Sequence, residues 1–302
     1  MPEDVWPKLD WADWRDTCVT LQLWTQVIGK IRMGLTPKLN HCWNVTLYVT
    51  CRGLTTAPMP YGWKMLQIDM DFVDHLLVFQ STDGSREVVK LRSMSVATFY
   101  GEVMERLKSF GVAVHLWPTP CEVADPIPFE KDETHHSYDP EYAWRWWQAL
   151  VQVDRVFGKF RARFIGKVSP IHYFWGAMDV AVTRFSGRVA PVHPSTPGLP
   201  DRVVQDAYSH EVSSAGFWPG GESFPQAMFY SYAYPQPAGY DEAKVQPEAA
   251  SFNRGMGEFV LPYEAVRTAK DPDETLLAFL QSTYEAAANL GKWDRAGLET
   301  SS

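Results

Sequence analysis

The sequence lacks the patterns that mark a zinc-binding, disulfide-bonded or membrane-spanning chain. Its four cysteines, at positions 18, 42, 51 and 121, include no Cys-x-x-Cys pair. We therefore expect free, buried thiols and neither a structural zinc site nor a disulfide framework. No apolar run reaches the ~18 residues of a transmembrane helix, and the first ten residues do not follow a signal-peptide pattern. These absences favour a cytoplasmic protein with no membrane partner.

Basic clusters and common catalytic motifs are also missing. The 28 Lys and Arg residues are outnumbered by 36 Asp and Glu residues, which gives a net charge of −8 without any basic run. Such a chain is repelled by phosphate backbones, so a nucleic-acid partner is not expected. There is no Gly-x-Gly-x-x-Gly, Walker, Gly-x-Ser-x-Gly or His-Glu-x-x-His motif, so the sequence does not decide whether the protein is an enzyme.

Aromatic residues, in contrast, are abundant. The 302 residues include 13 Trp, 13 Tyr and 16 Phe, and aromatics make up 14% of the chain. Each ring buries roughly 150–250 Å², and the hydroxyl of Tyr and the indole N–H of Trp also form hydrogen bonds. The composition therefore suits a large core and the wall of a ligand pocket equally well.

Periodicity predicts an α+β fold with mostly antiparallel strands. Alternating apolar residues predict strands over 65–72, 75–80 and 87–92, and Asp83-Gly84 is typical of a hairpin turn. Helical spacing, with Ser95 as N-cap, predicts a helix from there to Phe110. A second set of helices and strands follows residue 140 in the same order.

The two halves of the chain also resemble each other locally. The sequence VIGKIR at 27–32 matches VFGKFR at 156–161, and each precedes an expected strand. We interpret this as an internal duplication that gives two related units, each a helix, an antiparallel sheet and a helix. The predicted domains are 1–125 and 141–302, joined by an acidic, proline-rich connector over 126–140.

Two segments of the second half could carry chemistry. If 172–184 is one strand, His172 and Arg184 share a face around an apolar strip, where Arg184 could bind an anion and His172 could transfer a proton. In the segment from Tyr208, alternation places Tyr208 and His210 on one face and Glu211 on the other. A stripe of tyrosines over 230–234 follows.

The leading hypothesis is an enzyme that acts on a small polar or anionic metabolite in an aromatic-lined cleft between the halves. His172 or His210 would be the acid/base, Arg184 the anion anchor and Tyr208 a hydrogen-bond donor. The remaining expected ligand-binding residues are Asp179, Trp175, Trp218, Tyr230 and Arg52.

Two alternatives stay open. One is a non-catalytic ligand-binding or scaffold protein whose aromatic residues pack a core or a dimer surface; either a monomer or a homodimer fits the sequence. The other is a metal-dependent enzyme in which His41, His172, His210 and Glu211 would be the metal ligands. The sequence does not indicate any other cofactor. Nothing in the spacing of these four residues requires a metal.

Long motifs across the chain also indicate a family. They are WPKL, LWTQVIGKIR, HCWNVTLYVTCRGLTT, SPIHYFWGAMDVAVTRFSGR, YSHEVSSAGFWPGG and LPYEAVR. With these motifs the sequence resembles a bacterial family of about 300 residues known only as a domain of unknown function. The resemblance implies a single full-length unit and brings no activity, cofactor or site residue with it.

Overall fold

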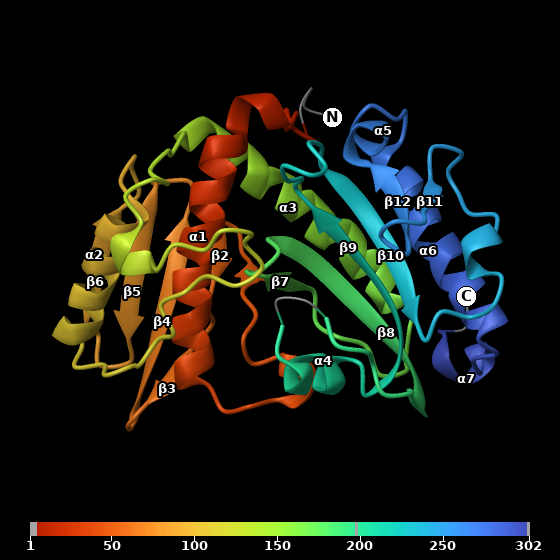
Figure 1. Cartoon of the computed structure of the whole chain (residues 1–302), viewed down its shortest axis with the longest axis horizontal. Coiled ribbons are helices and arrows are strands. Elements are labelled where there is room, and N and C mark those ends of the chain that lie inside the picture. Colours follow the sequence, from red (N-terminus) through yellow and green to blue (C-terminus); the bar gives the residue numbers. More distant parts are fainter. Residues whose placement is uncertain (1–4, 197–198, 301–302) are drawn as a thin grey trace. The chain divides into compact units, whose positions relative to one another are not determined.

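The computed structural model describes residues 5–196 and 199–300, and this part of the chain has seven α-helices and two six-stranded antiparallel sheets (Figure 1). The predicted α+β class is therefore confirmed. The α-helices are α1 (Trp11–Leu35), α2 (Val96–Ser109), α3 (Pro140–Ala162), α4 (Asp201–Ala207), α5 (Tyr263–Arg267), α6 (Pro272–Leu290) and α7 (Arg295–Leu298). Short 3-10 turns occur at Asn40–Cys42, Phe129–Lys131 and Tyr240–Glu242. No helix in this described part combines the length and apolar composition needed to cross a bilayer.

The strands divide between the two sheets. One sheet contains β1 (Tyr48–Val49), β2 (Gly53–Thr55), β3 (Met59–Tyr61), β4 (Lys64–Asp71), β5 (Leu76–Ser81) and β6 (Arg86–Lys90). The other contains β7 (His172–Phe174), β8 (Asp179–Val189), β9 (His210–Trp218), β10 (Met228–Tyr234), β11 (Ser251–Asn253) and β12 (Glu258–Pro262).

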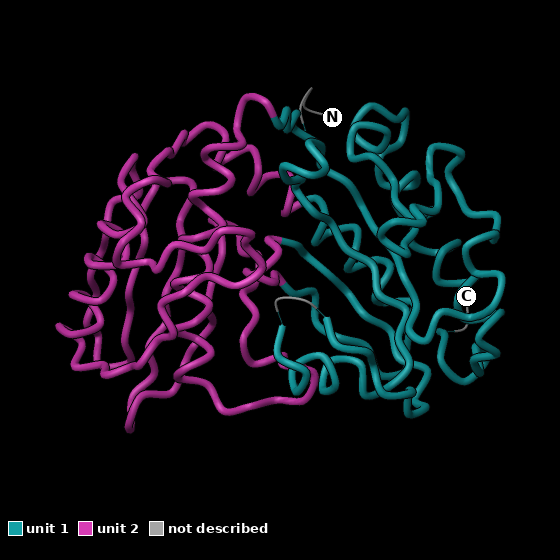
Figure 2. The backbone as a smooth tube through the Cα atoms, in the orientation of Figure 1, with its two compact units in different colours: residues 1–11, 152–172, 179–302 teal, residues 12–151, 173–178 magenta. Residues whose placement is uncertain are grey.

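The chain forms two compact units, and each unit is made of segments that alternate along the sequence (Figure 2). Unit 1 comprises residues 1–11, 152–172 and 179–302, and unit 2 comprises residues 12–151 and 173–178. The division at 1–125, 126–140 and 141–302 remains a prediction from the sequence.

Unit 2 is built on the order β1-β2-β4-β5-β6, with β3 also paired to β4. Alternation along β4 buries Leu66, Ile68 and Met70 on one face. Trp24 of α1 stacks on Phe99 of α2, with ring centres 4.7 Å apart. The predicted N-cap of α2 is confirmed, because the Ser95 side chain accepts a hydrogen bond from the Thr98 N–H at 3.1 Å.

Unit 1 is built on the order β11-β12-β10-β9-β8-β7. The face formed by Val182, Arg184, Phe217 and Phe229 is buried, and Arg184 contacts rings of both α3 and α6, so these helices cover it. The N-terminal segment also packs on unit 1. Trp6 lies against Phe229 and Tyr263.

The strand expected over 172–184 is interrupted, which corrects the prediction that His172 and Arg184 share one face of one strand. β7 ends at Phe174, and the chain turns at 175–178 before β8 begins at Asp179. Contacts remote in sequence hold this turn: the side-chain amide of Gln22 donates to the Gly176 carbonyl at 2.6 Å. The alternation of residue types along 172–184 does not reflect such a contact, so it predicted one continuous strand.

Along the chain, a long helix precedes each antiparallel sheet (α1 and α3) and a further helix follows it (α2 and α6), which is the order that the sequence predicts. The internal duplication itself remains a prediction, because a shared order of elements does not establish a common origin.

Candidate functional site

The expected anion anchor, Arg184, lies inside an aromatic enclosure on the helix-covered face of unit 1. Its side chain is 1% exposed, and its guanidinium carbon lies 3.5 Å from the ring centre of Phe160 and 4.3 Å from that of Tyr284. It also donates a hydrogen bond to the Phe160 carbonyl oxygen. Burial lowers the pKa of Arg184 to about 10, so the group stays charged at neutral pH. This placement makes Arg184 a packing element between β8 and the helices.

Two other expected ligand residues, Trp175 and Arg52, make structural contacts within unit 2. The Trp175 indole N–H donates to the Val45 carbonyl at 2.7 Å, and a Cβ on Gly29 would lie 2.2 Å from the Trp175 ring. Arg52 forms ion pairs with Asp71 and Asp74, each at 2.6 Å. Both side chains are thus held by their own unit.

The proposed metal ligands are not brought together. No three His, Cys, Asp or Glu side chains within residues 5–196 and 199–300 are arranged to hold a metal ion. His172 is buried at the start of β7, and His41 adopts a left-handed backbone conformation with φ of 56° in unit 2. Glu211 accepts hydrogen bonds from Arg188 and Ser186 through one oxygen.

The opposite face of the unit 1 sheet, away from α3 and α6, carries polar and aromatic residues in register. The pairings of β8, β9, β10 and β12 set two rows of neighbours. The first row is Glu258, Tyr232, Ser214 and Thr183, and the second is Val260, Tyr230, Gly216 and Ala181. We call Asp179, Tyr208, Tyr230, Tyr232 and Glu258 the tyrosine–carboxylate face.

Tyr230 and Asp179 form the first hydrogen bond of this face. The Tyr230 hydroxyl donates to Oδ2 of Asp179, a carboxylate that is 9% exposed. The ring reaches Asp179 by crossing β9 at Gly216, where a Cβ would lie 2.3 Å from the ring and hydroxyl of Tyr230. Glycine is therefore required at 216 for this bond to form.

A second pair of hydroxyls lies beside the first. The hydroxyl oxygens of Tyr232 and Tyr208 are 2.9 Å apart, and those of Thr183 and Ser214 are also 2.9 Å apart. Burial raises the pKa of Tyr232 far above its ordinary value, so this phenol stays protonated and can donate. The face thus presents several fixed hydroxyl groups.

Glu258 supplies the titratable group of the tyrosine–carboxylate face. It is half-buried at the start of β12, and the register places it beside Tyr232. Burial, and secondarily the negative charge of Asp179, raises the pKa of the Glu258 carboxyl to about 7. A carboxyl group with this pKa exchanges protons readily near neutral pH.

The structure gathers three of the predicted site residues, Asp179, Tyr208 and Tyr230, on this one face. Tyr208 lies just after α4, a helix that the sequence did not predict. Trp218 pairs with Met228 at the end of β9. His210 lies at the start of β9, with its Nδ1 3.1 Å from the Ser209 hydroxyl oxygen.

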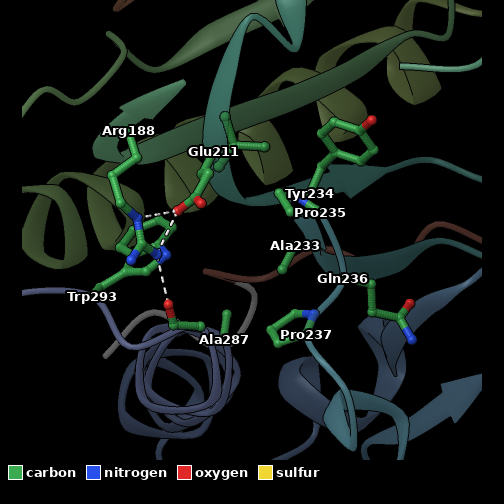
Figure 3. A pocket seen from close by; sticks show the side chains of 11 residues that line it. Arg188, Glu211, Ala233, Tyr234, Pro235, Gln236, Pro237, Ala287 and Trp293 are labelled. Carbon is green, nitrogen blue, oxygen red and sulfur yellow. Dashed lines mark hydrogen bonds and ion pairs between the residues drawn. The ribbon is translucent and has the colours of Figure 1, made fainter. Parts of the chain in front are cut away.

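A small hollow of about 190 Å³ lies elsewhere in unit 1, between the end of β10 and the end of α6. Figure 3 shows Arg188 at its edge, joined to Glu211 and to the backbone of α6's C-terminal end. Nη2 of Arg188 lies 2.6 Å from both Oε2 of Glu211 and the Gly291 carbonyl oxygen. Since a cation is favourable at a helix C-terminus, this ion pair fixes α6 to the sheet.

A wider groove of about 460 Å³ lies on the polar face of the unit 2 sheet. Its carboxylates bind neighbouring side chains: Asp69 accepts from Gln67 and Gln80, and Asp71 accepts from Arg52. Both carboxylates are therefore paired with other side chains of the groove. Burial acts to raise the pKa of Asp71, but the hydrogen bond from Arg52 and those from backbone N–H groups outweigh it and lower this pKa below its ordinary value.

Comparison with protein families identifies the chain. Residues 6–300 match the family of unknown function DUF5996. The chain belongs to DUF5996. No curated protein and no solved structure matched it. The resemblance found in the sequence motifs is thereby confirmed, and the family match spans both units of this DUF5996 protein.

Sequence reasoning missed Glu258. The apolar residues over 258–261 are typical of a strand, and nothing in that pattern marks its first residue as a site residue. Alternation does place Glu258 on the same face as Val260. The signal that it neighbours Tyr232 is the β10–β12 register, which the sequence alone does not define.

Proposed function

We propose that this DUF5996 protein is an enzyme that transfers a proton to or from a small polar metabolite bound on the tyrosine–carboxylate face. The observation that carries the proposal is Glu258, a half-buried carboxyl group whose pKa is raised to about 7 beside fixed tyrosine hydroxyls. Perturbed carboxyl groups next to ordered hydrogen-bond donors are typical of acid/base sites.

Each residue of the face has a distinct role in this proposal. Glu258 takes or gives the proton. Asp179 holds the Tyr230 hydroxyl, whose oxygen is then oriented to accept a hydrogen bond from the substrate. Tyr232, paired with Tyr208, positions a second polar group. Arg184 contributes packing, so the proposal differs from the sequence hypothesis in using a carboxyl group as the acid/base and no arginine anchor.

The test is consumption of metabolites by the purified protein. Wild type is incubated at pH 7 with a mixture of small polar metabolites, and their concentrations are followed by mass spectrometry. We expect at least one compound to be consumed, and Glu258→Gln to slow this by about 100-fold or more, because general acid/base groups contribute about that factor. The matched control is Glu248→Gln, an exposed carboxyl group in a turn of unit 1, which should leave the rate unchanged.

Two outcomes would overturn the proposal. One is equal consumption by wild type and Glu258→Gln. The other is a compound that binds but is never consumed, which would favour the non-catalytic ligand-binding alternative that the sequence left open.

A further inference from the structure

The tyrosine–carboxylate face is acidic and carries little positive charge. Among the described residues that β8, β9, β10 and β12 place on this face are two carboxylates, and neither lysine nor arginine is among them. None of the ion pairs within the described residues involves Glu258. Elsewhere in unit 1, the half-buried Asp273 pairs with two cations, Arg155 and Lys159.

A lysine lies against the other end of β8. Nζ of Lys167 is 4.9 Å from the ring centre of Phe185, six residues along the strand from Asp179. It is attracted by Asp206, which lies in α4. Lys167 is therefore held at the Phe185 end of β8.

Aromatic rings flank the carboxylates. The rings of Tyr230 and Tyr232 are nearly parallel, at 18°, with centres 6.2 Å apart, and Tyr208 lies 6.2 Å from Tyr232. The electron-rich faces of such rings attract cations, and a neighbouring carboxylate adds direct charge attraction. The chain already surrounds one cation in this way, since Arg184 lies among Phe160, Phe164 and Tyr284.

We propose that the tyrosine–carboxylate face recognises an organic cation, a small molecule bearing an ammonium or quaternary ammonium group. The inference rests on the site of the proposed function and names the class of its substrate. The rings of Tyr230 and Tyr232 contact the cation, and Glu258 supplies the opposite charge. An anionic metabolite, which the sequence left possible, does not fit these groups.

Binding of a cation should also change the protonation of Glu258. A positive charge beside Glu258 favours its ionised form, so binding releases a proton whenever Glu258 is protonated beforehand. With a pKa of about 7, roughly half a proton is released per cation bound at pH 7. The other titratable groups facing Glu258 are Asp179, Tyr230, Tyr232 and Tyr240, and the three phenols have raised pKa values and stay neutral.

The experiment is calorimetric titration of the full-length protein with choline, in two buffers of different ionisation enthalpy at pH 7. The probe 3,3-dimethylbutan-1-ol has the shape of choline without its charge, and acetate tests the opposite charge. We expect choline to bind with proton release. The neutral and anionic probes should bind at least about tenfold more weakly, because a tenfold loss of affinity is the contribution of about one cation–ring or ion-pair contact.

Variants separate the ring from the hydroxyl. Tyr232→Leu should weaken choline binding about tenfold, whereas Tyr232→Phe keeps the ring face and should bind like wild type. Glu258→Gln should weaken binding and abolish proton release, and Glu248→Gln should do neither. Circular dichroism and melting curves show whether each variant folds, and Tyr232→Phe and Glu258→Gln are conservative enough to keep the test valid if Tyr232→Leu does not fold.

The two proposals fail separately. Equal binding of choline and its neutral analogue, or choline binding that neither Tyr232→Leu nor Glu258→Gln weakens, would overturn the cation inference. Consumption of a neutral or anionic metabolite that depends on Glu258 would also overturn it while supporting the enzyme. Choline binding with the predicted pattern would support the inference even if no metabolite were ever consumed.

Discussion

Glu258 shows how one residue acquires its chemistry from its position in the fold. A glutamate in water loses its proton near pH 4.5, but partial burial and the nearby charge of Asp179 move the pKa of Glu258 to about 7. The printed sequence contains 36 acidic residues, and nothing local distinguishes this one. Its special character comes from strands that are distant in sequence.

The raised pKa predicts a pH dependence of stability. The folded state holds the Glu258 proton more tightly than the unfolded state does, so this residue's contribution is fully present below about pH 4.5 and is lost as pH rises through 7. Relative to Glu258→Gln, the free energy of unfolding of wild type should fall by roughly 3 kcal/mol between pH 4.5 and pH 8. Chemical denaturation of both proteins at several pH values measures this. Parallel curves for the two proteins would contradict the prediction.

At the scale of elements, the β9–β10 pair determines whether the tyrosine–carboxylate face forms. Alternation along 228–234 already predicts from sequence that the tyrosines share a face, and the structure confirms this pattern. Strands β4, β5 and β6 were likewise predictable, because their apolar residues alternate and Asp83-Gly84 marks the turn.

Other elements could not be predicted, for identifiable reasons. The residues from 43 to 52 alternate like a strand, but the structure has only Tyr48–Val49 as a strand there, and the chain just before turns through left-handed conformations at His41 and Cys42. The apparent strand over 172–184 breaks at a turn held by Gln22 and by Trp175. In both cases the deciding contact or backbone angle is not encoded in local periodicity.

The glycine under Tyr230 gives a prediction at this scale. Gly216→Ala places a methyl group where the Tyr230 ring lies, so the ring must move and its bond to Asp179 is lost. We expect a loss of about 1–3 kcal/mol in stability from the overpacking, together with weaker ligand binding. The control is Gly158→Ala in α3, where a Cβ meets no atom within 4 Å and should stabilise the helix by about 0.5–1 kcal/mol. Denaturant melts that rank the two variants in the opposite order would show that the ring is not held over Gly216.

At the scale of the whole molecule, the sequence correctly predicted an α+β protein with antiparallel sheets and the family to which it belongs. The candidate site was only partly predictable. The sequence named Asp179, Tyr208 and Tyr230 among its site residues, and the structure places all three on the tyrosine–carboxylate face. The side chains of Arg184 and Trp175, which the sequence also named, lie against distant helices and loops. Charged and aromatic residue types indicate possible chemistry, and only the packing shows which of them reach a ligand.

The most direct test of the account is the pKa of Glu258 itself. Carbon-13 NMR of the glutamate carboxyl groups, assigned by comparison with Glu258→Gln, follows its titration in the intact protein. We predict a midpoint near pH 7 in wild type and a lower one in Asp179→Asn, because that substitution removes a neighbouring negative charge. A Glu258 that titrates near 4.5, like an exposed glutamate, would contradict the assignment of the tyrosine–carboxylate face as an acid/base site.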